Sequence, residues 1–395
     1  MKTLYVHVGT PKTATSAIQK FCCDNRSVLE AKGYCYPEFP WTYPPKSANR
    51  NALFLQSAVR DASGRRNPEE EKRRVREGLD MVVRQFAEHS CVVLSDEGLW
   101  QPMYDRRKTL WQELVEEAKK SGFTVKAIVY LRRQDEFLSS WWNQLIKMRR
   151  PVPGRHYETM TWEEYRGNVP DSMQLDYYGA LERISAVIGK ENVIVRRFDK
   201  KYFYGGTIQA DFLHCLGLEM TEEFRILQEN VNMRLSGNMP EIKRILNTMP
   251  EMNARENWFF WQALLSCSDI SEKEYKCSMF SPEETAEFLE IYEEGNQKIV
   301  QEYLLEGDAP LFHTDIKDVP KWEKDNPYMQ ADVIRFIGET DLLLFRKIEE
   351  ENAKLRRELN ELKDMLKHPG RAVFRKIKKG YVFLVRCFTK SQNNV

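Results

Sequence analysis

The chain has 395 residues, of which 42% are hydrophobic and 12% aromatic, and it contains 8 Cys, 17 Pro and 19 Gly. This composition excludes collagen-like, disulfide-scaffold and largely disordered proteins, and it allows a large hydrophobic core. Because 60 basic residues nearly balance 59 acidic ones and leave a formal charge of +1, the molecule as a whole has no field that would attract nucleic acid or a membrane.

The N-terminal segment and the cysteines predict a cytoplasmic protein. Met1 leads almost directly into the apolar run 4–8, without the charged leader and long apolar segment of a signal peptide. The cysteines are scattered through a large chain, which is typical of reduced thiols rather than of a disulfide framework. The sequence contains no uninterrupted apolar window of about 18 residues, so we expect no membrane-spanning helix.

Apolar runs alternate with helix-like stretches in the first half of the chain. Expected strands are 4–8, 91–94, 125–131 and 193–195, and expected helices start at 15 and cover 73–88, 110–121 and 175–188. This alternation predicts an α/β fold, a doubly wound parallel sheet that helices cover on both faces. Residues 207–218 and 239–305 are expected helical insertions. The long polar stretches 36–50 and 149–171 are typical of functional loops.

The first strand-to-helix turn has the make-up of a phosphate-binding loop. It presents backbone N–H groups and hydroxyls at a helix N-terminus, where the helix dipole favours an anion. Compared with the nucleotide-binding signature GxxxxGK[ST], Gly9 and Ser16 match, but Ala14 replaces the second Gly and Thr15 replaces the Lys. The lysine lies three residues earlier, at Lys12. This position would bring the ammonium group of Lys12 to an oxygen that bridges two anionic groups. The loop is therefore expected to serve a reaction other than ordinary ATP hydrolysis.

This P-loop-type segment resembles the 5′-phosphosulfate loop of sulfotransferases that use 3′-phosphoadenosine 5′-phosphosulfate (PAPS), which reads P-K-[ST]-[GA]-T-[ST]. The residues that fit are Pro11, Lys12, Thr13, Ala14, Thr15 and Ser16. The second signature of that family is a strand-terminal Arg followed eight residues later by a Ser, and Arg132 and Ser140 have this spacing. The sequence looks closest to bacterial, glycan-directed sulfotransferases, over about residues 1–312.

The resemblance implies transfer of a sulfuryl group from PAPS to a hydroxyl or amine of a carbohydrate or glycoconjugate. Lys12 would stabilise the leaving phosphate oxygen, residues 11–16 would bind the 5′-phosphate, and Arg132 with Ser140 would bind the 3′-phosphate. Arg133 is the alternative to Arg132. Sulfuryl transfer moves a group of lower charge than phosphoryl, so no metal is required, and no metal-ligand spacing is found among the six His.

An acceptor hydroxyl needs a base near the loop, at the carboxyl end of a neighbouring strand. The strand 91–94 delivers Asp96 and Glu97 there, and the resemblance implies that Glu97 is the base, with Asp96 in reserve. The other interpretation is that this acidic pair caps the following helix. His7 lies inside the first strand and is interpreted as a core residue.

Other parts of the family pattern carry over less closely. Phe198 stands where family members have a Tyr near the adenine, and Arg234 with Ser236 lies in the segment 230–237, where a late loop closes over the 3′-phosphate. A plain surface loop is the alternative in both cases. Acceptor contacts are expected from the two long loops, through Trp41, Tyr43, Lys46, Arg149, Arg150, Arg155 and His156.

The last part of the chain has a different pattern. After an expected linker at 313–340, the segment 341–367 carries a heptad seam with Asn352 at an a position; its apolar members are Phe345, Ile348, Leu355, Leu359, Leu362 and Leu366. A dimeric coiled coil through 345–366 and a helix packed on its own domain both remain open. The basic tail 368–395, with seven Lys or Arg and no acid in 371–395, is either an interfacial helix that holds the protein at the inner face of the plasma membrane or a solvated segment.

Two further functions compete with the sulfotransferase interpretation. The run from Val92 to Glu97 imitates the acidic strand end of a P-loop nucleotide kinase or ATPase, but such an enzyme would not explain Thr15 in place of the Lys. A catalytically inactive scaffold that dimerises through the heptad helix is the second alternative, and the retained Lys12 argues against it.

Overall fold

The computed structural model describes residues 2–44, 46–100, 109–148, 156–169, 174–226, 234–306 and 309–367. Its strands are β1 (Thr3–His7), β2 (Tyr34–Cys35), β3 (Cys91–Ser95), β4 (Thr124–Leu131) and β5 (Val193–Arg197). Its α-helices are α1 (Thr15–Asp24), α2 (Arg26–Ala31), α3 (Pro68–Gln85), α5 (Leu110–Ser121), α6 (Gln134–Met148), α7 (Trp162–Gly167), α8 (Tyr177–Ile188), α9 (Ile208–Cys215), α10 (Met239–Leu246), α11 (Ala254–Glu274), α12 (Pro282–Ile299) and α13 (Met329–Lys367).

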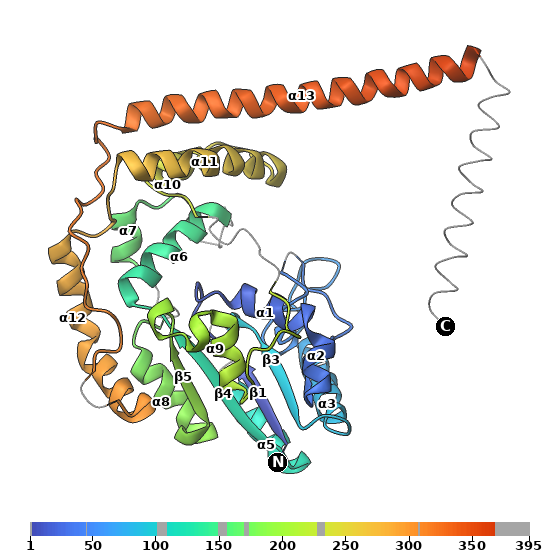
Figure 1. Ribbon diagram of the computed structural model, residues 1–395, viewed down its shortest axis with the longest axis vertical. Coiled ribbons are helices and arrows are strands. Elements are labelled where there is room, and N and C mark those ends of the chain that lie inside the picture. The colour runs from blue at the N-terminus through green and yellow to red at the C-terminus, as the bar shows by residue number, and fades with distance from the viewer. Residues whose placement is uncertain are drawn as a thin grey trace.

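The five strands form one parallel sheet in the order β2-β3-β1-β4-β5, with β1 in the centre. From β1 the chain builds one half of the sheet through β2 and β3 and then crosses to the other side for β4 and β5. Figure 1 shows the sheet with its helices. The expected α/β class with a parallel sheet is confirmed.

Successive strand residues point to opposite faces of the sheet, and both faces are apolar, so helices cover both of them. Val6 and Val92 pack into one buried cluster with residues of α3, α5 and α8. Tyr5 and Val93, each adjacent to one of these residues in its strand, pack into a second cluster with residues of α1 and α9. The sheet is therefore the middle layer of three.

Differences from the expected elements have local causes. β2 was not predicted, because two residues are too few to leave an alternating pattern. α3 begins at Pro68 instead of 73, since the Asn67 side chain accepts a hydrogen bond from the Glu70 backbone and Pro68 takes the first helical position. The expected helical region 239–305 is divided into α10, α11 and α12, and the last continues as one π-helical stretch, Val300–Leu304.

The helix α13 begins inside the expected linker, 313–340. It starts at Met329, so the last part of that segment is helical. The first turn of α13 is anchored by Asp332, which is fully buried and accepts hydrogen bonds from Ser271 Oγ at 2.5 Å and Asn238 Nδ2 at 2.9 Å. The division of the chain into catalytic domain, linker and heptad helix remains a prediction.

Among the described helices, none is both long and apolar enough to cross a membrane. The basic tail lies outside the described residues, so its contact with a membrane surface also remains a prediction.

Candidate active site

The carboxyl ends of four parallel strands bring the predicted site residues to one edge of the sheet. The register pairs His7 of β1 with Ser95 of β3, and Leu131 of β4 with Arg197 of β5. The residues that follow these strands are the loop 8–14, the Asp96–Glu97 pair, Arg132 and Phe198. In open parallel sheets, ligands bind at this edge where the strand order reverses.

The loop after β1 is a tight, internally bonded turn. Gly9 and Ala14 both have left-handed φ angles, of 51° and 55°. A Cβ at Gly9 would lie 2.7 Å from the Thr15 methyl carbon, so this position requires glycine. Thr10 donates from its backbone N to the Tyr130 carbonyl at 3.0 Å, and the Thr13 hydroxyl donates to the Thr10 carbonyl at 2.5 Å. The hydroxyl of Thr13, a predicted 5′-phosphate contact, is buried and bonds within the loop, whereas Ser16 is exposed.

Lys12 is the cation of this loop and lies in a positively charged environment. Its backbone has φ 72°, and its Nζ donates to Gln144 Oε1 of α6 at 3.2 Å. Burial, followed by the charges of Lys147 and Arg132, lowers the pKa of Lys12 to about 8, while Glu97 opposes the shift. Three cations close enough to repel each other indicate a site for an anion.

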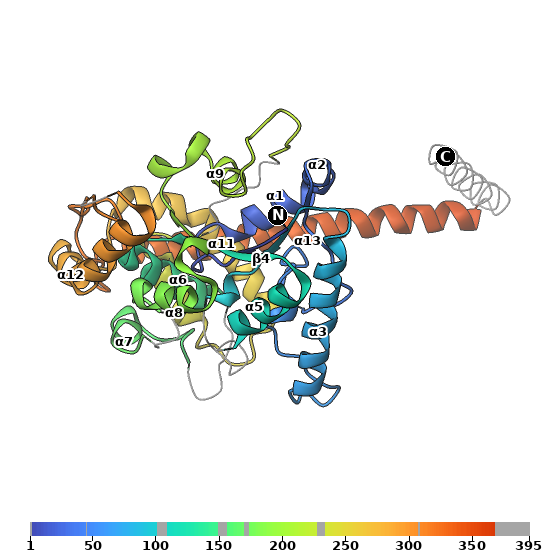
Figure 2. The same ribbon diagram turned by 90° about the horizontal axis from the view of Figure 1, so that it is seen from below.

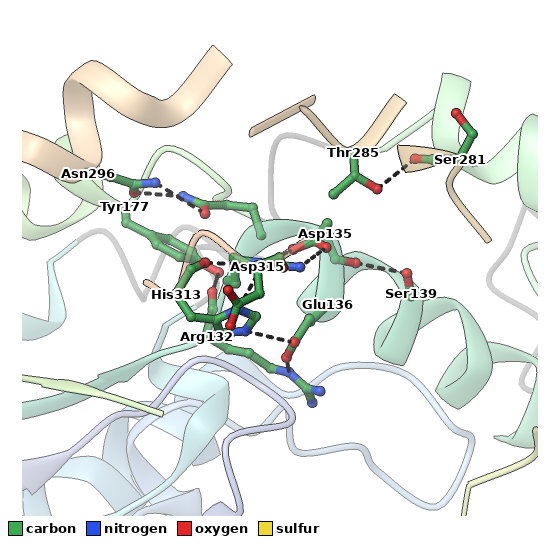
Figure 3. A network of polar contacts seen from close by, with 12 residues as sticks. Arg132, Asp135, Glu136, Ser139, Tyr177, Ser281, Thr285, Asn296, His313 and Asp315 are labelled. Atoms are coloured by element: carbon green, nitrogen blue, oxygen red, sulfur yellow. Dashed lines mark hydrogen bonds and ion pairs between the residues drawn. The ribbon is translucent and has the colours of Figure 1, made fainter. Parts of the chain in front are cut away.

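Arg132 joins the end of β4 to the loop. Its Nη1 donates to the Lys12 carbonyl at 3.2 Å. Its Nε lies 3.1 Å from Glu136 Oε2 on the first turn of α6, as Figure 3 shows. Its guanidinium carbon lies 5.8 Å from the centre of the Phe198 ring, so that ring contacts the arginine. The Tyr177 hydroxyl donates to the Arg132 carbonyl at 2.8 Å. The side chain is therefore oriented from several sides.

Arg133 has a structural role and does not substitute for Arg132. Its side chain is buried and forms a two-bond ion pair with Asp135, at 2.8 Å for each bond. Its Nη1 also donates to the backbone carbonyls of His313 and Asp315, at 3.1 and 2.8 Å. These bonds attach the segment after the π-helical stretch to the sheet. The guanidinium of Arg133 therefore stabilises the fold.

The acidic pair after β3 divides into a fully buried carboxylate, Asp96, and a partly exposed one, Glu97. Asp96 is fully buried, lies 2.5 Å from Arg50 Nη2, and accepts hydrogen bonds from Gln56 Nε2 at 2.8 Å and the Gly98 backbone at 2.6 Å. It caps the short helix that follows, as the alternative interpretation expected for the pair. Asp96 is therefore unsuited to act as the reserve base.

Glu97 is partly accessible. Its Oε1 lies 2.9 Å from Arg50 Nη1, and its Oε2 accepts from Gln19 Nε2 of α1 at 3.1 Å. Burial and the charge of Asp96 raise the pKa of Glu97, although Arg50 opposes the shift. A carboxylate with a raised pKa is a stronger base.

His7 belongs to the core, as expected. It is fully buried, its Nδ1 lies 2.8 Å from Ser95 Oγ, and burial lowers the pKa of His7 to about 3. The ring is neutral at ordinary pH and packs edge-on against Tyr130 and Phe212.

A cavity of about 390 Å³ lies beside the loop, between α6 and the helical insertions. Its lining includes Lys12, Arg132, Ser140 and Arg234 of the predicted site, together with Arg133 and Ser236. Arg234 is held by Glu272, at 3.2 Å, and the neighbouring Leu235 carbonyl accepts from Asn143 of α6 at 2.8 Å. The described structure thus brings together residues from three separate parts of the sequence.

Sequence reasoning missed several polar residues of the cavity, Gln144 and Lys147 among them, and the two residues that hold Glu97. Gln144 and Lys147 lie four and seven residues after Ser140, which places them on the same face of α6, and both line the cavity. Helical periodicity could have indicated them. Arg50 and Gln19 carried no such signal, because only the folded chain brings them to Glu97.

The expected acceptor residues do not gather at the cavity. Trp41 and Tyr43 lie against the guanidinium of Arg74 on α3, at 5.9 and 5.4 Å, and Lys46 Nζ donates to Ser57 Oγ at 2.9 Å. None of the three lines the cavity. Exposed His156 lies 3.6 Å from Glu158, while Arg149, Arg150 and Arg155 lie outside the described residues.

Within the described ranges, no group of three or more His, Cys, Asp or Glu side chains is arranged to hold a metal ion.

Comparisons with known proteins give limited similarity. No family model matches the chain. An uncharacterized protein of Archaeoglobus fulgidus is 30% identical over 180 residues, which are 45% of this chain and 45% of that protein, so the match spans about half the length of the relative. The crystal structure of a sulfotransferase from Alicyclobacillus acidocaldarius has 15% identity and a TM-score of 0.34, covering 58% of this chain and 86% of that one. Such a loose superposition establishes no shared activity.

Proposed function

We propose that this chain is a sulfotransferase that transfers a sulfuryl group from PAPS to a hydroxyl or amine of a carbohydrate or glycoconjugate. The observation that carries the proposal is the joining of two basic elements: Lys12 of the loop and Arg132, directly after β4, line one cavity, and the Arg132 side chain donates to the Lys12 carbonyl. A donor with phosphates at both ends of its ribose needs two such sites at a fixed separation.

The charges at the site fit a polyanionic donor. Burial, followed by the positive charges of Lys147 and Arg132, lowers the pKa of Lys12, and a bound anion would oppose this shift by favouring the charged lysine. The loop 9–16 would hold the 5′ end through its backbone and Ser16. Arg132 and Ser140 would hold the 3′-phosphate, with Arg234 as a further cation of the same cavity.

The donor would supply the sulfuryl group, and the residues of this chain would handle the charge and the proton. Lys12 would neutralise charge on the oxygen between phosphate and sulfur as that bond breaks. Glu97 would accept the proton of the acceptor hydroxyl as its oxygen bonds to sulfur. The position of Glu97, close enough for its charge to act on Lys12, supports this division of roles.

The geometry weighs against a nucleotide kinase or ATPase. In such enzymes the acidic residue after the strand helps to hold Mg²⁺. Here Asp96 is fully buried and bonded to Arg50, Gln56 and the Gly98 backbone. Thr15 begins α1 where the phosphate-binding lysine would be.

Calorimetric titration tests the proposal. Adenosine 3′,5′-bisphosphate should bind without a metal and more tightly than ATP with Mg²⁺. Arg132→Ala removes one charge-assisted contact. It should weaken binding of the bisphosphate by about 1.5–3 kcal/mol, which raises the dissociation constant roughly 10- to 100-fold. Lys119→Ala, on the exposed surface of α5, is the matched control and should bind normally. Preference for ATP with Mg²⁺ would refute the proposal.

The acceptor class requires a separate assay. Labelled sulfate transfer should be measured with carbohydrates, glycolipids and small hydroxyl compounds as acceptors. Transfer to small compounds but to no carbohydrate would reject the glycan acceptor while leaving the sulfotransferase assignment intact.

A further inference from the structure

The C-terminal half of α13 projects from the rest of the protein. With 39 residues and a rise of 1.5 Å per residue, the helix is about 58 Å long. Its first half packs on α11, where Phe336 is buried with Trp261 and Leu264. Figures 1 and 2 show that its second half extends beyond the end of α11.

From Phe345 onward, α13 keeps the apolar residues of the heptad seam in contact with solvent. Phe345 is 59% exposed, Leu355 60% and Leu362 57%, and the remaining apolar seam residues are also exposed. These side chains recur at the a and d positions of three heptads, 345–366. The seam begins only there, because the preceding a and d positions are Gly338 and Asp341. The alternative that this seam packs on its own domain is therefore wrong for the described chain.

The charges beside the seam are arranged in complementary pairs. The charged g positions are Glu351 and Glu358, and the e positions that follow them by five residues are Arg356 and Lys363. The other e position, Glu349, follows the apolar Leu344 by the same spacing. In a parallel pair of helices in register, each g residue faces the e residue of the next heptad of its partner. Both contacts would then join opposite charges, and the two-fold symmetry would repeat them.

An antiparallel pair would reverse this result. In that arrangement g faces g and e faces e, which places Glu351 and Glu358 together and Arg356 and Lys363 together. Like charges at these positions oppose association.

We propose that residues 345–366 of α13 form a parallel, in-register coiled coil with a second copy of this chain. The exposed seam supplies the apolar contact, and the g-to-e charge pattern selects the partner and its direction. Asn352 at an a position meets its own copy across the two-fold axis, an arrangement that specifies register at some cost in stability. The proposal concerns a surface distant from the cavity and does not depend on the proposed enzymatic function.

Light scattering on the full chain gives the first test. The measured mass should approach twice the chain mass of 46.7 kDa as the concentration rises. Reversal of both g charges in Glu351→Lys/Glu358→Lys should shift the protein toward the mass of one chain. Glu350→Lys/Glu361→Lys makes the same change in net charge at positions outside the seam and should leave the dimer intact. A single-chain mass for the unsubstituted protein would overturn the proposal.

Mixing gives the second test. Arg356→Glu/Lys363→Glu should also be monomeric alone, and it should form a mixed dimer with Glu351→Lys/Glu358→Lys, because every g-to-e contact between them joins opposite charges. If the mixture remains monomeric, the charge pairs do not lie at the interface.

Disulfide trapping determines direction and register. In a parallel, in-register dimer the two copies of residue 352 lie side by side, so Asn352→Cys should give a covalent dimer under mild oxidation. Arg357→Cys, on the outer f position, and the unsubstituted chain with its native cysteines should give much less. Equal trapping of all three proteins would overturn the in-register arrangement.

Discussion

The side chain of Arg132 donates a hydrogen bond to the backbone carbonyl of Lys12, at 3.2 Å, across 120 residues of sequence. The bond joins the loop after β1 to the first residue after β4. The two elements proposed to bind the donor therefore have a fixed separation before any ligand binds, which would reduce the entropy lost on binding.

Substitution of Lys12 tests its role in the transfer step. Lys12→Ala should lower kcat by about 10²- to 10³-fold, since this Nζ would neutralise charge that develops on the leaving oxygen. The measurement is the rate of labelled sulfate transfer at saturating donor. Lys20→Ala, in the same helix-and-loop unit, removes an exposed lysine paired with Asp24 and should keep the normal rate. Equal rates for the two variants would contradict the assignment.

The two carboxylates after β3 should respond differently to removal of their charge. Glu97→Gln should lower kcat by about 10²- to 10⁴-fold because it removes the base, with little change in the free energy of unfolding. Asp96→Asn should lower the free energy of unfolding by about 3 kcal/mol, because it leaves the buried Arg50 without its closest partner. Transfer rates and urea unfolding curves separate the two effects. Near-normal turnover in Glu97→Gln would reject the base.

The pKa of Lys12 predicts how bisphosphate binding depends on pH. At pH values below the Lys12 pKa of about 8, the lysine is already charged. Its titration should therefore not change the affinity for adenosine 3′,5′-bisphosphate in that range. Above that pH the free protein must take up a proton to bind the anion, and the dissociation constant should rise by up to about tenfold per pH unit. Titrations at several pH values measure the slope. The slope should disappear in Lys12→Ala.

Lys147 should act on the ligand directly and on Lys12 through its charge. Lys147→Gln should weaken bisphosphate binding by about tenfold, the loss of a modest charge-assisted contact. Because it removes a neighbouring positive charge, it should also raise the pKa of Lys12 and move the alkaline loss of binding to higher pH. Lys119→Gln on α5 makes the same chemical change away from the cavity. An unchanged pH profile in Lys147→Gln would contradict the coupling.

The neighbours Arg132 and Arg133 should separate binding from stability. Arg133→Ala should lower the free energy of unfolding by about 3 kcal/mol, because it leaves Asp135 buried without its charge partner and frees the segment at His313. Arg132→Ala should change the free energy of unfolding by about 1 kcal/mol or less, since its ion pair with Glu136 is partly exposed. Thermal unfolding of both variants measures the difference. Equal destabilisation would show that Arg132 is also a structural residue.

Local patterns in the sequence were enough to predict the layout of the sheet. Apolar runs located four of the five strands, and α5 spans the predicted 110–121. The parallel arrangement then placed the loop, the acidic pair, Arg132 and Phe198 at one edge, because parallel strands end on the same side. The roles of these residues stay predictions, but their proximity follows from the strand pattern.

Contacts between distant segments were beyond such reasoning. Nothing local distinguishes Arg132 from Arg133 or Asp96 from Glu97, since each pair is adjacent in sequence and alike in chemistry. Arg133 becomes structural because the segment at 313–315 returns to accept its hydrogen bonds, and Asp96 because Arg50 and Gln56 reach it from a loop about 40 residues earlier. The sequence alone therefore determined which elements form and which ends they share, because helix and strand patterns depend on near neighbours. Which member of each charged pair remains available to a ligand was decided by tertiary packing, because burial and ion pairing depend on residues that meet only in the folded chain.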